Sequence, residues 1–195
     1  MARKSSAIKL PSPLIESLRD LIAWLEAEKI QQVVIGGVAV ALIAQPRMTE
    51  DIDAVISLDP DLLESFLLTA TSYGFAPRIS DAADFARRRR VILLQHQPTG
   101  VNVDLSCGVL PFEEEMILRA RFLTIGSLKI KVATPEDLVI TKAVAHRPRD
   151  IADIESILNI EPTLDFERIR FWVSQFAEAL EMPELMEDLE KLLSR

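Results

Sequence analysis

The sequence has few of the residues that build disulfides and zinc sites. Its 195 residues include one cysteine, Cys107, and two histidines, His96 and His146. A single cysteine cannot form an internal disulfide, and three such side chains are fewer than the four ligands of a typical structural zinc site. We therefore expect neither a disulfide-rich secreted scaffold nor a zinc domain, and we expect a reducing compartment such as the cytoplasm.

Long apolar runs are missing as well. The longest, residues 33–44, has 12 residues and contains two glycines. A membrane-spanning helix needs about 20 apolar residues. The basic start of the chain is not followed by an apolar segment, because Glu16, Arg19 and Asp20 interrupt it. Neither a membrane span nor a signal peptide is expected.

Positive charge is not in excess. The chain has 22 Lys and Arg against 30 Asp and Glu, a net charge of −8. This balance argues against general adhesion to nucleic acid, which favours basic surfaces. The basic residues are unevenly spread, however, and residues 87–90 are four consecutive arginines. Such a run is usually a solvated face, but it can also contact an RNA acceptor, and both interpretations stay open.

The apolar pattern favours strands mixed with helices in the first two thirds of the chain. Residues 12–29 have apolar side chains at helical spacing, and residues 51–57 alternate acidic and apolar residues like a half-buried strand. Turn residues at 97–100 and 126–127 indicate two hairpins. The other elements expected here are strands at 32–35, 91–95, 101–105, 122–125 and 128–132, and helices at 38–44, from 59 onward and at 112–121.

From Thr134 onward the pattern is helical. Thr134 can cap a helix that has Pro135 in its first turn. Helices are expected at 135–145, 149–158, 165–180 and 183–193. The predicted fold class is therefore α+β, with a small mixed sheet flanked by helices in residues 1–133 and a C-terminal helical subdomain in residues 134–195.

Two acids in the strand at 51–57 carry the first chemical signal. Asp51 and Asp53 are two residues apart, so both carboxylates point to the same face of the sheet. Like charges held together on one face repel, and a bound cation is a common compensation. Ligands that are all oxygen suit Mg²⁺ or Mn²⁺. The simpler alternative is the solvated face of an edge strand.

Two glycines and a third acid strengthen the metal interpretation. Gly36 and Gly37 lie where a strand turns into a helix, a place where backbone N–H groups can bind a phosphate. Taken alone, they could also be a tight turn with no ligand. Asp104 lies in a strand between apolar residues, where an acid is costly unless it is paired or bound to metal. It could bind a second metal or act as the base for an acceptor.

These residues resemble a known family. The glycine pair, the acids and the spacing between them are similar to the nucleotidyltransferase fold shared with DNA polymerase β. The motif reads Gly36-Gly37, then Arg47-x-Thr49-x-Asp51-x-Asp53, then Asp104. The stretches 133–142 and 147–154, with Lys142 and Asp150, resemble the AbiEii-type toxin branch of this superfamily.

The resemblance implies a role for each matching residue. Gly36 and Gly37 would cradle the triphosphate, and the three acids would bind Mg²⁺ or Mn²⁺. Lys142 would meet the triphosphate, and Asp150 would orient Lys142 or the nucleotide. Without the resemblance, these two residues could be a surface lysine and a helix-start acid.

Three positions qualify this match. Arg47 and Thr49 would bind substrate or merely anchor the loop before the acidic strand. At Gly37 many relatives have serine, so a hydroxyl contact to the nucleotide is lost here while the backbone N–H remains.

The expected function is transfer of a nucleoside monophosphate from a nucleoside triphosphate to an acceptor hydroxyl. The resemblance implies tRNA as the acceptor and a toxin that is paired with an antitoxin protein. A protein side chain or a small molecule such as an aminoglycoside is an alternative acceptor. A module that binds nucleotide without turnover is the alternative outside catalysis.

Overall fold

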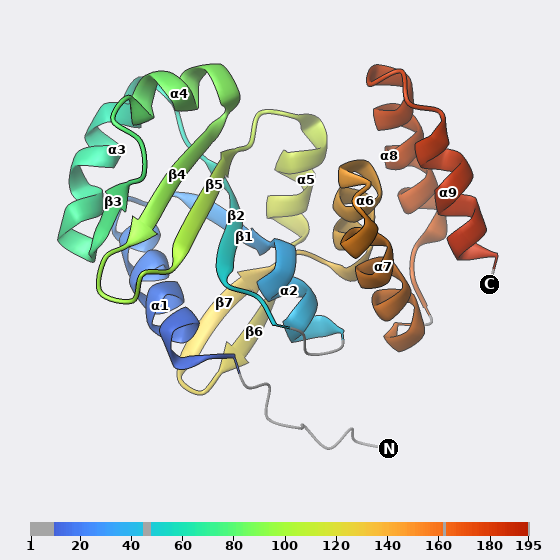
Figure 1. Cartoon of the computed structure of the whole chain (residues 1–195), viewed down its shortest axis with the longest axis horizontal. Helices are drawn as coiled ribbons and strands as arrows, with labels where there is room; N and C mark the ends of the chain where they lie inside the picture. Colours follow the sequence, from blue (N-terminus) through green and yellow to red (C-terminus); the bar gives the residue numbers. More distant parts are fainter. Residues whose placement is uncertain (1–9, 45–47, 162, 195) are drawn as a thin grey trace. The chain divides into compact units, whose positions relative to one another are not determined.

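The computed structural model describes residues 10–44, 48–161 and 163–194, and the chain forms two compact units. The first, here called the sheet unit, lies within residues 1–41 and 46–133. The second, here called the helical unit, lies within residues 42–45 and 134–195. Figure 1 follows both units along the chain. Each unit has its own apolar core, and each is described by itself below.

The sheet unit is a mixed sheet with helices packed against it. Its helices are α1 (Ser12–Ala27), α3 (Leu63–Ala70), α4 (Ala82–Arg89) and α5 (Pro111–Arg119), together with the start of α2 (Gly36–Ile43). Short 3₁₀ turns lie at Pro60–Leu62 and Thr71–Tyr73. The strands are β1 (Gln31–Ile35), β2 (Asp51–Ser57), β3 (Phe75–Pro77), β4 (Val91–His96), β5 (Asn102–Cys107), β6 (Arg121–Ile125) and β7 (Leu128–Val132).

The seven strands form one sheet in the order β3-β4-β5-β2-β1-β7-β6 (Figure 1). β2 lies at its centre, antiparallel to β1 and parallel to β5. The predicted α+β class with a mixed sheet is confirmed, although the sheet is larger than expected. β3 and α4 were not predicted. β3 has only three residues, and α4 ends in the arginine run, so neither segment has a clear apolar period.

Helix α1 covers the face of the sheet opposite Asp104. Leu93 is the cross-strand partner of Asp104, and His96, three residues later, points to the other face. There the His96 ring lies 3.1 Å from both the Ser17 hydroxyl and an Asp20 carboxylate oxygen of α1. Ser17 and His96 are fully buried, so this Ser–His–Asp series anchors the helix and is closed to any substrate.

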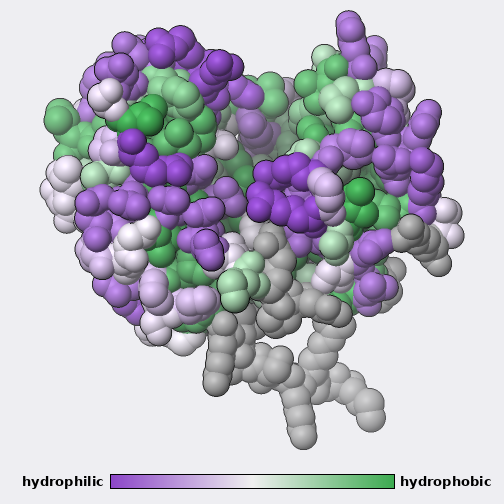
Figure 2. Space-filling view, in the orientation of Figure 1, coloured by the Kyte–Doolittle hydropathy of each residue, from purple (hydrophilic) through white to green (hydrophobic). Residues whose placement is uncertain are grey.

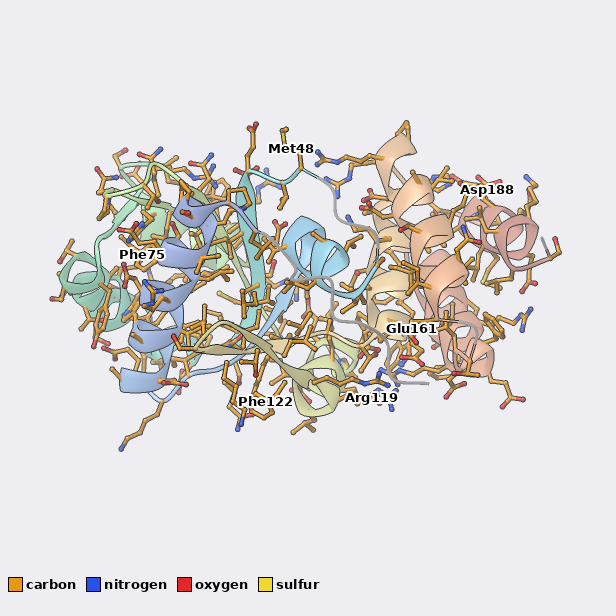
Figure 3. All side chains as sticks on the ribbon, turned by 90° about the horizontal axis from the view of Figure 1, so that it is seen from below. Met48, Phe75, Arg119, Phe122, Glu161 and Asp188 are labelled. Atoms are coloured by element: carbon orange, nitrogen blue, oxygen red, sulfur yellow. The ribbon has the colours of Figure 1, made fainter. Side chains whose placement is uncertain are left out.

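The apolar core of the sheet unit is centred on Trp24 of α1. Its ring stacks on Phe66 and Phe75, with ring centroids 4.1 and 5.6 Å apart. Phe75 is labelled in Figure 3. Trp24 also donates a 2.9 Å hydrogen bond to Thr69, so its one polar atom is satisfied. The apolar residues at helical spacing in α1 thus pack against the sheet and against α3.

The helical unit contains α6 (Pro135–Ala145), α7 (Pro148–Ile160), α8 (Phe166–Ala179) and α9 (Glu184–Leu193). The Thr134 side chain accepts a hydrogen bond from the Asp137 backbone N–H at 3.2 Å, which is the predicted N-cap. Apolar stripes on the four helices meet in a common core formed by Leu138, Ile154, Ile157, Ile169, Val173, Leu185 and Leu189. In Figure 2, polar and apolar residues are mixed over the visible face. Among the described residues, no helix is long and apolar enough to span a membrane.

Candidate active site

Asp51 and Asp53 begin the central strand β2. Asp51 is exposed, Asp53 is half-buried, and Ile52 between them is fully buried. This alternation places both carboxylates on one face of the sheet and the isoleucine on the other. The local sequence pattern is sufficient for this placement, because side chains alternate along any strand.

Asp104 joins the two acids through strand pairing. β5 runs parallel to β2, and Asp53 and Asp104 are partners in register. Partners in register point to the same face, so the three carboxylates share one face of the sheet. Burial raises the pKa of Asp104, Arg78 lowers it, and the charges of Asp53 and Asp51 raise it further. The net effect is a pKa above the ordinary value, so the negative charge at Asp104 is incompletely compensated.

Arg78 is a residue of this face that the sequence did not reveal. It follows β3, and its backbone N–H donates to the Leu93 carbonyl at 2.9 Å. From there its guanidinium donates a hydrogen bond to Asp104 Oδ1 and forms an ion pair with it. The two side chains are 29% and 37% exposed. Arg78 lies 26 residues before Asp104 in the chain, and no local motif links them.

The three acids share one face of the sheet and have the chemistry of ligands for a divalent cation. Three carboxylates supply the oxygen ligands that Mg²⁺ and Mn²⁺ prefer, and the raised pKa of Asp104 indicates that further positive charge would be accepted. Their present arrangement is open: across the described ranges, no three His, Cys, Asp or Glu side chains are placed to hold a metal ion together. Closing the set requires a movement of at least one carboxylate, and Asp104 is engaged with Arg78.

Gly36 lies directly against this face. It has a φ of +65°, and a Cβ added there would come within 2.0 Å of Asp53 Oδ2. Only glycine therefore allows the turn from β1 into α2 and the close approach of the carboxylate. Gly37 follows in the first turn of α2, where backbone N–H groups lack helical acceptors. The sequence motif thus places a helix start next to Asp53.

The loop before β2 is only partly described. The Thr49 hydroxyl donates a 3.3 Å hydrogen bond to the backbone oxygen of Asp51. This contact fits the interpretation in which Thr49 anchors the loop, and it leaves substrate binding as a prediction. Arg47, the other loop residue of the motif, lies outside the described residues.

Lys142 and Asp150 meet in the helical unit. Lys142 Nζ lies 2.8 Å from Asp150 Oδ1 and 2.9 Å from Asp153 Oδ2. The side chains are 6%, 0% and 5% exposed, so Lys142 is a buried link between α6 and α7 and not a surface lysine. Asp153 was part of the resembling stretch but had no predicted role. Its signal was its position three residues after Asp150, on the same face of a helix.

Arg147 completes the surroundings of Asp150. Its Nε donates to Asp150 Oδ2 at 2.6 Å, and its backbone N–H lies 3.3 Å from the same oxygen. Burial alone would raise the pKa of Asp150, but the hydrogen bonds from Arg147 and Lys142 outweigh burial and lower that pKa below its ordinary value. Asp150 is therefore held as an anion at neutral pH.

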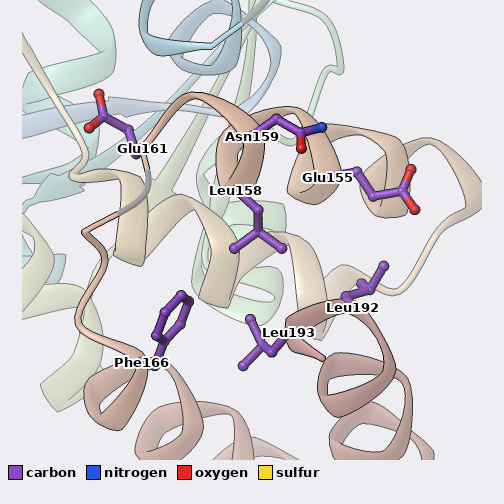
Figure 4. A pocket seen from close by; sticks show the side chains of 7 residues that line it. All are labelled: Glu155, Leu158, Asn159, Glu161, Phe166, Leu192 and Leu193. Atoms are coloured by element: carbon purple, nitrogen blue, oxygen red, sulfur yellow. The ribbon is translucent and has the colours of Figure 1, made fainter. Parts of the chain in front are cut away.

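The helical unit also contains a cavity of about 360 Å³. It is open to solvent, and Figure 4 shows its lining side chains: Glu155, Leu158, Asn159, Glu161, Phe166, Leu192 and Leu193. Among the residues that the structure describes, this lining includes two acids and no cationic side chain. The cavity therefore does not suit a triphosphate, which needs positive charge or backbone N–H donors.

Comparison with known families gives one match over most of the chain. Residues 14–184 match the family described as "Nucleotidyltransferase of unknown function (DUF6036)". No curated protein matches the chain.

Several solved structures have the same fold at low sequence identity. An antigenic nucleotidyltransferase-like protein from Paracoccidioides brasiliensis is 19% identical with a TM-score of 0.53, over 95% of this chain and 93% of that one. The antibiotic-resistance factor ANT(2'')-Ia is 11% identical with a TM-score of 0.61, over 90% and 97%. The lincosamide antibiotic adenylyltransferase LnuA, solved with lincomycin bound, is 14% identical with a TM-score of 0.52, over 74% and 96%. At these identities the similarity establishes the fold.

Proposed function

Because the chain belongs to the DUF6036 family of nucleotidyltransferases, we propose that it transfers a nucleoside monophosphate from a nucleoside triphosphate to an acceptor hydroxyl at the Asp51–Asp53–Asp104 face. The observation that carries this proposal is the parallel register of Asp53 with Asp104, which brings the third acid to the face of the other two. The glycine turn adjoins the same face, so anion and cation sites would be neighbours.

The chain's own residues would bind and position the reactants. Asp51, Asp53 and Asp104 would hold Mg²⁺ or Mn²⁺, which would stabilise the charge of the transferred phosphoryl group. The backbone N–H groups at Gly36 and Gly37 would bind phosphate oxygens at the start of α2. The acceptor hydroxyl would attack the α-phosphate in line with the departing pyrophosphate. No covalent intermediate with the protein is needed, because positioning and charge stabilisation supply the catalysis.

A nucleotide-binding role for Lys142 and Asp150 would require a rearrangement of their ion pairs. Lys142 has two carboxylate partners and is nearly buried, so contact with a triphosphate would require it to exchange one of them. Asp150 is within hydrogen-bonding distance and could orient the ammonium for that exchange. Binding of the nucleotide by Arg47 and Thr49 is retained as part of the proposal.

Two acceptors are proposed. The resemblance to the AbiEii-type branch favours tRNA, and with it a cytoplasmic toxin with an antitoxin partner. A small hydroxylated antibiotic is the second candidate, because the fold is shared with ANT(2'')-Ia, solved with adenylyl-2''-tobramycin at 12% identity and a TM-score of 0.60. The two candidates differ in acceptor only, and the nucleotide chemistry is common to both.

An acceptor screen tests the proposal. The full chain is incubated with each α-labelled nucleoside triphosphate and Mg²⁺ or Mn²⁺, in the presence of total tRNA, cell protein, aminoglycosides or lincosamides. We expect label on tRNA with one preferred triphosphate, and none with the Asp53→Asn variant. Label on an antibiotic alone would replace the tRNA proposal. Metal-dependent nucleotide binding with no label on any acceptor and no pyrophosphate release would favour the binding module.

A further inference from the structure

Arg78 is a cationic side chain that lies at the proposed metal face. We propose that Arg78 pairs with Asp104 and competes with the divalent cation for that carboxylate. The inference rests on the proposed function, since it takes Asp51, Asp53 and Asp104 as the metal-holding acids. It adds a residue outside the recognised motif and states what that residue does to metal binding.

A backbone hydrogen bond holds Arg78 at this face of the sheet. Its N–H is hydrogen-bonded to the carbonyl of Leu93, the cross-strand partner of Asp104. The guanidinium then extends from the end of the edge strand β3 across β4 and reaches Asp104 Oδ1 of β5. Because the two side chains are 29% and 37% exposed, the pair can separate without opening the apolar core. Separation would cost little, since exposed ion pairs contribute modestly to stability.

The charges explain why Arg78 and a metal ion exclude each other. Asp104 is in register with Asp53 and shares a face of the sheet with Asp53 and Asp51, so three negative charges lie on that face and a nearby cation is favourable. Arg78 supplies that charge in the arrangement described, in which no three acids of the described residues are placed to hold a metal. A divalent ion bound by Asp104 would meet the like charge of the guanidinium at the same carboxylate. Arg78 therefore has to leave before the three acids close around the metal.

The proposal predicts the direction in which the loss of Arg78 changes the affinity for metal. Removing Arg78 takes away a competitor, so the affinity for a divalent cation rises. An arginine that only holds Asp104 in a binding-ready position would have the opposite effect, because its removal would loosen a ligand and weaken metal binding. Mn²⁺ suits the measurement, since its free concentration can be followed by electron paramagnetic resonance without nucleotide.

Mn²⁺ is therefore titrated into the full-length wild type and the variants Arg78→Gln, Arg78→Lys, Asp53→Asn and Arg170→Gln. Arg170 is a matched control, because it forms a two-bond ion pair with Glu190 in the helical unit, at 2.6 and 3.0 Å. We expect Arg78→Gln to lower the Kd for Mn²⁺ by about twofold to fivefold, the range that corresponds to the loss of one partly exposed ion pair. Arg78→Lys should lie between Arg78→Gln and the wild type, and Arg170→Gln should match the wild type.

The outcomes separate this proposal from the proposed function. If Asp53→Asn abolishes Mn²⁺ binding and Arg78→Gln leaves the affinity unchanged or weakens it, the metal face stands and the role of Arg78 is overturned. If neither the wild type nor Arg78→Gln binds Mn²⁺ under any condition, the metal face fails, and the role of Arg78 fails with it. Circular dichroism of each variant checks the fold. A second readout is the Mn²⁺ concentration for half-maximal nucleotide transfer, which should be lower in Arg78→Gln than in the wild type.

Discussion

The two charged clusters of the molecule have opposite electrostatic characters. On the sheet, Asp104 is partly exposed, and its pKa is raised by burial and by two neighbouring acids, in spite of Arg78. In the helical unit, Asp150 is fully buried, and its pKa is lowered by hydrogen bonds from Arg147 and Lys142. In the first cluster the negative charge of Asp104 is incompletely compensated, whereas in the second the negative charge of Asp150 is compensated by Arg147 and Lys142. This contrast supports the proposal that the first cluster binds a cation, and it shows that the ion pairs of the second cluster stabilise the buried carboxylate.

The largest effect is expected from an acid on the sheet. Asp53→Asn removes a charged ligand but keeps the size of the side chain and the strand around it. Nucleotide transfer should fall by about 100-fold to 1000-fold or more, because stabilisation of the transition-state charge is lost. The thermal unfolding midpoint should change little. Wild-type transfer by this variant, or by Asp51→Asn, would remove both acids from the proposed metal site.

The second largest effect concerns stability in the helical unit. Lys142→Met leaves Asp150 and Asp153 buried without their shared ammonium. The free energy of unfolding measured in urea should fall by about 3–5 kcal/mol, the usual cost of removing one partner of a buried ion pair. Arg170→Gln is the matched control, since it breaks an exposed ion pair and should change unfolding little. Unchanged stability in Lys142→Met would argue that Lys142 is held for nucleotide binding instead.

A smaller effect should come from the glycine next to Asp53. Gly36→Ala has to place a Cβ at positive φ and within 2.0 Å of a carboxylate oxygen. The left-handed conformation costs about 1–2 kcal/mol of stability, and the displaced carboxylate should also reduce transfer. Gly100 offers a control, because it has a φ of +76° with nothing within 4 Å of an added Cβ. Gly100→Ala should therefore lose stability but keep transfer, and equal transfer in both variants would contradict the role of the Gly36 turn.

The smallest effect is a pH dependence. The lowered pKa of Asp150 means that its ionised form stabilises the folded protein above the ordinary value near 3.8. That contribution is lost as the pH falls through the folded-state pKa. Asp150→Asn should thus be less stable than the wild type at pH 7, and the difference should shrink as the pH falls below about 4. Urea unfolding of both proteins at several pH values measures it, and a constant difference would contradict the assignment.

Local patterns predicted many elements because helices and strands have fixed periods. The strands at 51–57 and 128–132 and the helix at 135–145 begin and end where they were expected. β3 and α4 were missed, since a three-residue strand and a helix ending in arginines lack an apolar period. The three acids could be named from the sequence, but no local pattern of residues could show that all three lie on one face of the sheet.

The sequence by itself determined that Asp51 and Asp53 face the same way and that a strand gives way to a helix at Gly36, because both follow from the local pattern of neighbouring residues. Only the tertiary structure decided that Asp104 lies beside Asp53, that Arg78 reaches Asp104, and that Lys142 is buried between two acids. These three facts depend on the register of strands and on the packing of helices that are distant in the chain. Register and packing are fixed when apolar surfaces are buried together, and no local pattern of residues specifies them.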